Sequence, residues 1–127
     1  MNNQPPQISR AEWQVMKVVW DISTPCSAQS VIDALSATNK WSVTTVKTLL
    51  GRLVQKGALS FIKEGKAYLY SAAVSRKACL AAEADSFLDR VFDGSLTPLI
   101  AHFARARGLR KRDIEELEAL LRETRKP

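Results

Sequence analysis

The stretch SVTTVKTLLGRLVQKG, residues 42–57, decides the fold, because it has the pattern of one amphipathic helix with an unusual outer face. At about 100° per residue, its apolar side chains gather on one side, which holds Val43, Val46, Leu49, Leu50 and Leu53. The other side carries Thr44, Thr48, Gly51, Arg52 and Gln55, with Thr45 and Lys47 at its margins. Ser42 is placed to cap this helix and Gly57 to end it.

The threonines on the outer face are informative because threonine is a mediocre helix former. A face that meets only water would be better made from Glu, Lys or Ala. Short hydroxyl side chains allow a close approach to a DNA groove, the threonine methyl suits the methyl of thymine, and arginine can bind guanine with two hydrogen bonds. We interpret the face as a DNA-reading surface; a merely solvated face is the alternative that this helix alone leaves open.

A second pattern follows directly in ALSFIKEGKAYLYS, residues 58–71. Side chains alternate on both sides of Glu64-Gly65, with Leu59, Phe61 and Lys63 on one face of the first strand and Lys66, Tyr68 and Tyr70 on one face of the second. A two-residue connection containing glycine between alternating strands predicts a β-hairpin. Lys63 and Lys66 flank its tip, where we expect them to contact phosphates.

The residues before the opening stretch predict two further helices. ISRAEW, residues 8–13, has the pattern of a capping box in which Ser9 and Glu12 satisfy each other's free amides. The core face that follows is formed by Trp13, Met16 and Trp20. DISTPC, residues 21–26, breaks this helix, and Ser27 is placed to cap a second one. Its inward side chains are Val31, Ile32 and Leu35.

Three helices followed by a hairpin predict a winged helix-turn-helix over residues 1–74. In that arrangement the third helix enters the major groove of DNA and the hairpin lies along the backbone. We therefore expect a mainly α (α+β) chain whose first part, residues 1–74, is a DNA-binding domain.

Residues 75–127 predict three more helices, one from about Ser75 to Phe92, one opened by Thr97-Pro98 and closed by Gly108, and one over RDIEELEALLRETRK. Three helices of this size have too little interior for their apolar side chains, and a twofold dimer is the commonest solution. We expect a helical dimerisation domain, whose contact residues are Phe87, Leu88, Val91, Phe92, Leu99, Phe103, Ile114, Leu117, Leu120 and Leu121.

Composition is that of an ordinary folded protein, with 46% hydrophobic and 25% charged residues among 127. No apolar run approaches the ~20 residues that span a bilayer, and residues 1–7 lack the apolar core of a secretory signal, so we expect a cytoplasmic protein without membrane insertion. The net charge of +6 favours a polyanionic partner. Residues 1–74 carry eight Lys/Arg against four Asp/Glu, and residues 75–127 carry eleven against nine.

Several classes of site are excluded by what the sequence lacks. Cys26 and Cys79 stand far apart without a CxxC partner, so we expect reduced, buried thiols. With His102 as the one histidine, no zinc cluster is expected, and we predict no metal site and no cofactor. No Ser/His/Asp constellation or glycine-rich phosphate loop is present, so we do not expect an enzyme.

Taken in order, these motifs resemble the BlaI/MecI/CopY penicillinase-repressor family of bacterial transcriptional regulators. The resemblance is carried by ISRAEWQVMKVVW, SVTTVKTLLGRLVQKGAL, KEGKAYLYS, FLDRVFDGSLTPLIAHFARARGL and DIEELEALL, and covers residues 8–122. It implies a winged helix followed by a helical dimerisation region, and a homodimer that represses resistance or metal-handling genes from inverted-repeat operators. By that resemblance the operator contacts lie between Ser42 and Thr48 and at Arg52, and the backbone contacts between Lys63 and Lys66.

The branches of this family differ in how the repressor is released. In the penicillinase branch, a membrane metalloprotease receptor triggers cleavage between Asn and Phe, in a segment that LIAHFAR resembles. The resemblance thus implies a membrane sensor protease, or a factor downstream of it, as a partner and His102-Phe103 as the candidate cleavage position, with histidine in place of asparagine. The copper-responsive branch uses a C-terminal cysteine-rich motif, and here no cysteine follows Cys79, so we expect no copper or zinc sensing by that route.

The sequence therefore favours a sequence-specific DNA-binding repressor that binds a palindromic operator as a homodimer. We expect an inducing signal to release it by proteolysis of the dimerisation region or by interference with it. The alternative is a winged-helix protein-interaction module without sequence-specific DNA binding. The Thr/Arg/Gln face lacks the large apolar patch on which such an interface normally centres.

Overall fold

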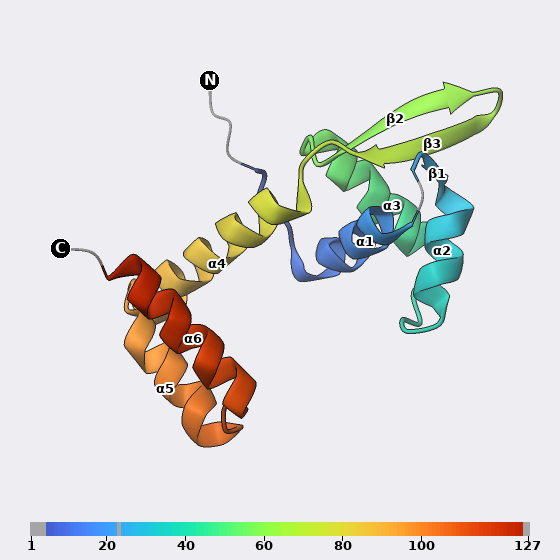
Figure 1. Ribbon diagram of the computed structural model, residues 1–127. Helices are drawn as coiled ribbons and strands as arrows, with labels where there is room; N and C mark the ends of the chain where they lie inside the picture. The colour runs from blue at the N-terminus through green and yellow to red at the C-terminus, as the bar shows by residue number, and fades with distance from the viewer. Residues whose placement is uncertain (1–4, 23, 126–127) are drawn as a thin grey trace. The chain divides into compact units, whose positions relative to one another are not determined.

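The computed structural model describes residues 5–22 and 24–125. In chain order the elements are α1 (Arg10–Asp21), β1 (Cys26–Ser27), α2 (Ala28–Ser36), α3 (Val43–Gln55), β2 (Leu59–Glu64), β3 (Ala67–Ala72), α4 (Arg76–Phe92), α5 (Leu96–Ala106) and α6 (Lys111–Thr124). The strands form one antiparallel sheet in the order β1-β3-β2. Three helices followed by a hairpin, as predicted, make the winged helix that Figure 1 shows in blue to yellow-green.

The ends of the first three helices are set by the residues that the sequence marks. At α1, Ser9 Oγ accepts the Glu12 N–H at 3.2 Å and Glu12 Oε1 accepts the Ser9 N–H at 2.9 Å, so the predicted capping box is confirmed. The predicted caps of α2 and α3 are also confirmed, because Ser27 and Ser42 each accept an amide of the first turn. Gly57 follows α3 with φ +82°, a conformation that L side chains rarely adopt.

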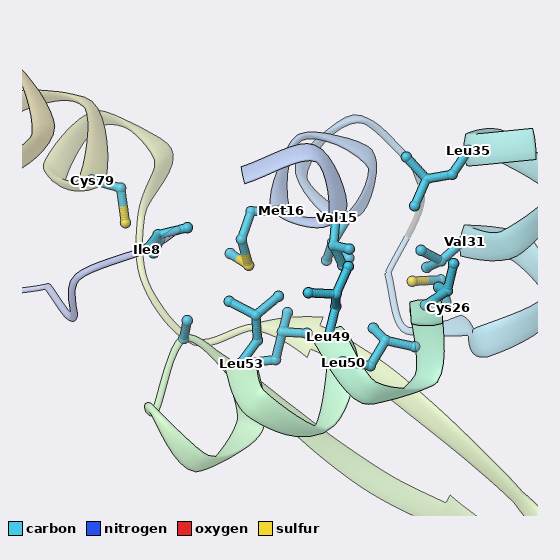
Figure 2. Packing of buried hydrophobic residues seen from close by; sticks show 14 residues of the cluster. Ile8, Val15, Met16, Cys26, Val31, Leu35, Leu49, Leu50, Leu53 and Cys79 are labelled. Carbon is cyan, nitrogen blue, oxygen red and sulfur yellow. The ribbon is translucent and has the colours of Figure 1, made fainter. Parts of the chain in front are cut away.

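One hydrophobic core holds α1, α2 and α3 against the sheet. Met16, Leu50 and Leu53 are its largest fully enclosed apolar side chains. Figure 2 shows Ile8 and Cys79 at one end of this cluster and Val31 and Leu35 at the other. Fully burying one leucine side chain contributes about 1.5–3 kcal/mol, so α3 is fixed firmly by one face while its opposite face stays outside.

An ion pair between a buried glutamate and a half-buried lysine side chain connects the start of α1 to the end of α3. The Glu12 side chain is 2% exposed and accepts a hydrogen bond from Lys56 Nζ, which also donates to the Gln7 carbonyl at 2.9 Å. Burial alone would raise the pKa of Glu12, but the hydrogen bonds from Lys56 and Ser9 outweigh it and lower that pKa. The pair therefore holds the C-terminal end of α3 against α1 as an ionised unit.

The hairpin forms as predicted, but its turn lies one residue later than the sequence indicates. The two residues between the strands are Gly65 and Lys66, not Glu64 and Gly65, and Glu64 pairs with Ala67. Lys66 therefore belongs to the turn and not to the second strand. Gly65 has φ +65° and occupies the first central position, where a type II′ turn takes glycine. The pairing of the short strand β1 with β3, Cys26 with Tyr70, was not predicted.

By contacts the chain divides into two compact units, Met1–Ala84 and Asp85–Pro127. The first turns of α4 belong to the first unit because the side chain of Cys79 is buried in its core. A functional boundary between residues 74 and 75 stays a prediction. Helix α5 has Ser95 as its N-cap and Leu96 as its first residue, two residues before the predicted cap Thr97 and first position Pro98. Its third position tolerates Pro98, since the first four amides of a helix have no intrahelical acceptor.

The second unit has no buried interior of its own. Within residues 85–125, which the structure describes, every side chain is exposed or half-buried. Across residues 5–22 and 24–125, no helix combines the length and apolar character needed to cross a bilayer.

Candidate nucleic-acid interface

The outer face of α3 is open to solvent along its whole length. All seven residues proposed from the sequence to address DNA on this helix are exposed: Ser42, Thr44, Thr45, Lys47, Thr48, Arg52 and Gln55. At the N-terminus, Ser42 Oγ accepts the Thr45 N–H at 3.1 Å and lies 3.0 Å from Thr45 Oγ1. These two hydroxyls therefore stabilise the first turn, whose free amides carry the positive end of the helix dipole. A helix N-terminus of this kind favours phosphate.

The two cations on α3, Lys47 and Arg52, have no carboxylate partner among the described residues. Three of the four acids in residues 1–74 have partners away from α3: Glu12 pairs with Lys56, Asp21 with Arg76 at 2.8 Å, and Asp33 accepts from Gln29 at 2.8 Å. The fourth, Glu64, ends β2 on the wing. Among the described residues, no carboxylate lies within 4.0 Å of a side-chain nitrogen of Lys47 or Arg52. The exposed face of α3 is thus positively charged and uncompensated.

The wing adds two lysines at the hairpin turn. Lys63 is the last but one residue of β2 and Lys66 lies in the turn, and both are exposed. The Lys63 ammonium lies 5.8 Å from the centroid of the Tyr68 ring, within cation–π range. Figure 1 shows the hairpin reaching beyond α1, α2 and α3. The wing lysines are therefore displayed away from the core, as a contact to a DNA backbone requires.

Three exposed residues of this surface were not singled out from the sequence. Val43, placed on the apolar side by its periodicity, is 49% exposed, whereas Val46, three residues later on the same side, is 1% exposed. Phe61 and Tyr68, which the alternation placed on the strand faces, are 46% and 45% exposed. Their exposure has no signal in the alternation, since that pattern does not tell where the helices stop covering the sheet.

The predicted dimerisation residues lie on the three C-terminal helices, where none is buried. The half-buried members are Leu88, Phe92, Leu99 and Leu117. The exposed members are Phe87, Val91, Phe103, Ile114, Leu120 and Leu121, from 38% to 60% exposed. Phe87 and Phe92 contact each other with ring centroids 5.8 Å apart. Large apolar side chains are thus displayed over the second unit without a core to receive them.

His102 and Phe103 lie in the middle of α5, with ring centroids 5.5 Å apart. Both are exposed, so the segment is reachable, but the peptide bond between them is part of a regular helix. The two cysteines are free and buried, and burial raises the pKa of both thiols. They are therefore poor nucleophiles at neutral pH.

Three helices followed by a small sheet with a projecting hairpin define a winged-helix protein. The exposed face of its third helix and its hairpin both carry cations, which is typical of a DNA-binding member of that class. The sequence profile of the penicillinase repressor family matches residues 8–123, and the chain belongs to that family.

Two relatives with names from this family align with the chain over most of their own length. The penicillinase repressor of Bacillus licheniformis is 38% identical over 118 residues, covering 93% of this chain and 91% of that one. The methicillin resistance regulatory protein MecI of Staphylococcus aureus (strain N315) is 31% identical over 121 residues, 95% of this chain and 98% of that one.

Two solved structures each match about three fifths of this chain. The monomeric form of Bacillus licheniformis BlaI in complex with the blaP half-operator is 43% identical with a TM-score of 0.52, covering 59% of this chain and 90% of that one. The DNA-binding domain of the repressor BlaI is 42% identical with a TM-score of 0.54, covering 61% and 93%.

Proposed function

We propose that this chain is a transcriptional repressor that binds DNA through α3 and the wing, and that it has no enzymatic activity. The observation that carries the proposal is the exposed Thr/Arg/Gln face of α3, free of acidic partners, in a chain of the penicillinase repressor family. Relatives named as repressors cover nearly its whole length, and a related winged helix is known in complex with a half-operator.

Each part of the interface has a distinct task in the proposed complex. Helix α3 lies in the major groove, where Arg52 binds a guanine and Thr44 and Thr48 contact base edges or methyl groups. The N-terminal end of α3, with Ser42, Thr45 and Lys47, binds phosphate, and Gln55 completes the outer face. The wing lysines Lys63 and Lys66 neutralise phosphates, which fixes register without reading sequence.

A homodimer is the second part of the proposal. The exposed apolar residues of α4, α5 and α6 need a covering surface, and a second copy supplies a self-complementary one. Two linked reading heads would bind the two halves of a palindromic operator, where the second contact gains effective concentration from the first. Residues 75–127 thus act as the dimerisation domain, and losing the dimer weakens repression without altering α3.

Release of the repressor by an inducing signal is the third part. Cleavage at His102-Phe103 would separate Phe103 and α6 from the apolar residues of α4 and the first half of α5. The dimer would then dissociate. A protease binds its substrate in an extended form, so this bond in α5 becomes a substrate only after local unwinding of the helix. A membrane sensor protease, or a factor that it activates, would provide the cut, and a ligand that disturbs the same helices would act equivalently.

The test of DNA reading is selection of bound fragments from genomic DNA with the purified protein, at physiological salt and with excess competitor DNA. We expect a palindromic sequence to be recovered. Arg52→Ala should weaken binding to that sequence by roughly 1–3 kcal/mol and relax the base preference at one position. Arg90→Ala, on an exposed part of α4, removes the same charge as a matched control and should leave the preference unchanged.

Recovery of no sequence, or equal weakening of operator and random DNA by Arg52→Ala, would contradict the proposed reading. A protein-interaction module would show apolar docking that added salt does not weaken, whereas DNA binding weakens steeply with salt. For the dimer, Leu121→Glu should give a folded monomer by sedimentation, because the side chain is already 60% exposed in the single chain. Glu115→Gln, on the same helix, should stay dimeric.

A further inference from the structure

The hairpin carries a row of aromatic side chains on one face, and core packing does not account for the two outer members, Phe61 and Tyr68. Phe61 and Tyr68 pack edge to face with ring centroids 5.2 Å apart, and Phe61 lies 6.4 Å from Tyr70. The register places them together, since Phe61 pairs with Tyr70 and Lys63 with Tyr68. We call these four residues, Phe61, Lys63, Tyr68 and Tyr70, the wing aromatic face.

The wing aromatic face begins in the core and runs out of it. Leu59 precedes Phe61 on the same face of β2 and is 2% exposed, and Tyr70 packs partly against the core cluster. Burial, with Tyr68 as a smaller contribution, raises the pKa of Tyr70. One step further along the hairpin, Phe61 and Tyr68 are nearly half exposed. The face therefore lies on the side of the sheet that packs against the helices, α3 included, and continues past them.

Exposure of this kind calls for a partner. Natural sheets commonly protect an exposed edge strand with charged side chains, yet on this projecting hairpin two large aromatic rings lie nearly half exposed beside one another. The chemistry around them limits what that partner can be. The tip is basic, with Lys63 over the Tyr68 ring and Lys66 in the turn against the single acid Glu64. A second copy on the same face would bring these lysines of two chains together, whereas a polyanion satisfies them.

We propose that Phe61 and Tyr68 bind the minor groove of the DNA next to the major groove that α3 occupies. This inference rests on the proposed operator binding and assigns two residues to it that read the flank of the site. Apolar side chains recur at protein contacts with the minor groove, and there the rings would lie against deoxyribose and base edges. Lys63, held beside Tyr68, would reach the phosphates that border the groove.

The lysines and the aromatic residues of the wing should differ in how their removal changes the salt dependence of DNA affinity. A lysine contact to phosphate releases counterions, so its removal lowers the slope of log affinity against log salt by about one. An aromatic contact releases none, so its removal lowers affinity at every salt concentration with the slope unchanged. Flanks with a narrow, A·T-rich minor groove fit such a contact best, because groove width depends on sequence.

The experiment uses the full chain and two synthetic duplexes made from the sequence recovered by genomic selection. One duplex keeps the base pairs that flank the region read by α3, and the other is trimmed of them. Phe61→Ala and Tyr68→Ala should each weaken binding to the flanked duplex by about 5- to 30-fold. On the trimmed duplex the same variants should bind as the parent protein does.

Two matched variants serve as controls. Ile62→Ala removes a side chain that is 58% exposed on the opposite face of the same strand, and it should bind both duplexes normally. Lys63→Ala should lower the salt slope, which the aromatic variants leave unchanged. Since Phe61, Ile62 and Tyr68 are 46%, 58% and 45% exposed and lie outside the core cluster, these variants should retain the fold, which circular dichroism and thermal melting check.

Three results would overturn the inference. One is that the aromatic variants bind the flanked duplex with the affinity of the parent protein. Another is that their affinity falls by the same factor on the flanked and the trimmed duplex. A loss of dimer mass in Phe61→Ala or Tyr68→Ala would instead assign the face to a protein contact. If the parent protein selects no DNA sequence, the proposed function fails and this inference falls with it. If it selects one and only the flank effect is missing, the inference fails alone.

Discussion

Replacing Lys56 with methionine tests whether the ion pair at the end of α3 is structurally important. The substitution keeps the length of the side chain and removes its charge, leaving the Glu12 carboxylate 2% exposed with the Ser9 N–H as its remaining hydrogen-bond donor. Breaking a fully buried pair costs about 3–5 kcal/mol. Lys56 is itself 35% exposed, so water can partly replace it, and we expect the free energy of unfolding to fall by about 2 kcal/mol at pH 7.

The sign of the pH dependence makes this prediction specific. The pKa of Glu12 is lowered in the folded chain, so its contribution to stability is present above its unfolded pKa and is lost as pH falls through the folded value. Without Lys56 the buried carboxylate is easier to protonate, and its protonation removes the cost of the unpaired charge. The difference between Lys56→Met and the parent should therefore be largest near neutral pH and shrink as the pH falls toward 4.

Urea unfolding followed by tryptophan fluorescence measures this difference, because Trp13, Trp20 and Trp41 all belong to the N-terminal unit. Lys17→Met is the matched control, since this exposed lysine of α1 has no carboxylate within ion-pair distance among the described residues. Equal destabilisation by the two substitutions, or a Lys56→Met effect that does not change with pH, would refute the reasoning.

Three further predictions concern the same unit. Leu50→Ala, at a fully enclosed position of α3, should lower the free energy of unfolding by about 2–5 kcal/mol, as chemical unfolding would show. Gly57→Ala should lower the free energy of unfolding by about 1 kcal/mol in the same assay. An added Cβ would meet no atom within 4 Å, but the backbone angle φ of +82° is strained for any residue with a side chain. Cys26 and Cys79 should react with a thiol reagent only at the rate of unfolding, and rapid labelling of the folded chain would show that one of them is accessible.

Helix starts and helix faces could be predicted from the sequence because they depend on residues close together in the chain. The capping box at Ser9 and Glu12 and the cap at Ser42 depend on side chains within three residues of each other, so the helix starts could be read from the sequence. The exposed face of α3 followed in the same way, since periodicity separates it from Val46, Leu49 and Leu53. Contact of these residues with DNA stays a prediction, because solvent exposure is compatible with any partner.

Features that depend on pairing were harder to predict. A turn at Glu64-Gly65 and one at Gly65-Lys66 both place glycine in a two-residue loop, and the alternation fits either. The first would set Lys63 opposite Lys66, whereas the observed register sets Lys63 opposite Tyr68 and Phe61 opposite Tyr70. Repulsion between lysines and the gain from aromatic pairs favour the second. The partnership of Glu12 with Lys56 joins residues 44 positions apart and left no local pattern.

Because no side chain in residues 85–125 is buried, the stability of this unit can depend on the cellular concentration of the protein. If a second copy provides the missing interior, the unit gains its stability only on association, and the folded fraction then depends on the total concentration of chains. Copy number would act as a control variable: below a threshold, the C-terminal helices would lose both partner and structure together. Dilution through growth, or a modest drop in synthesis, would then relieve repression steeply instead of in proportion.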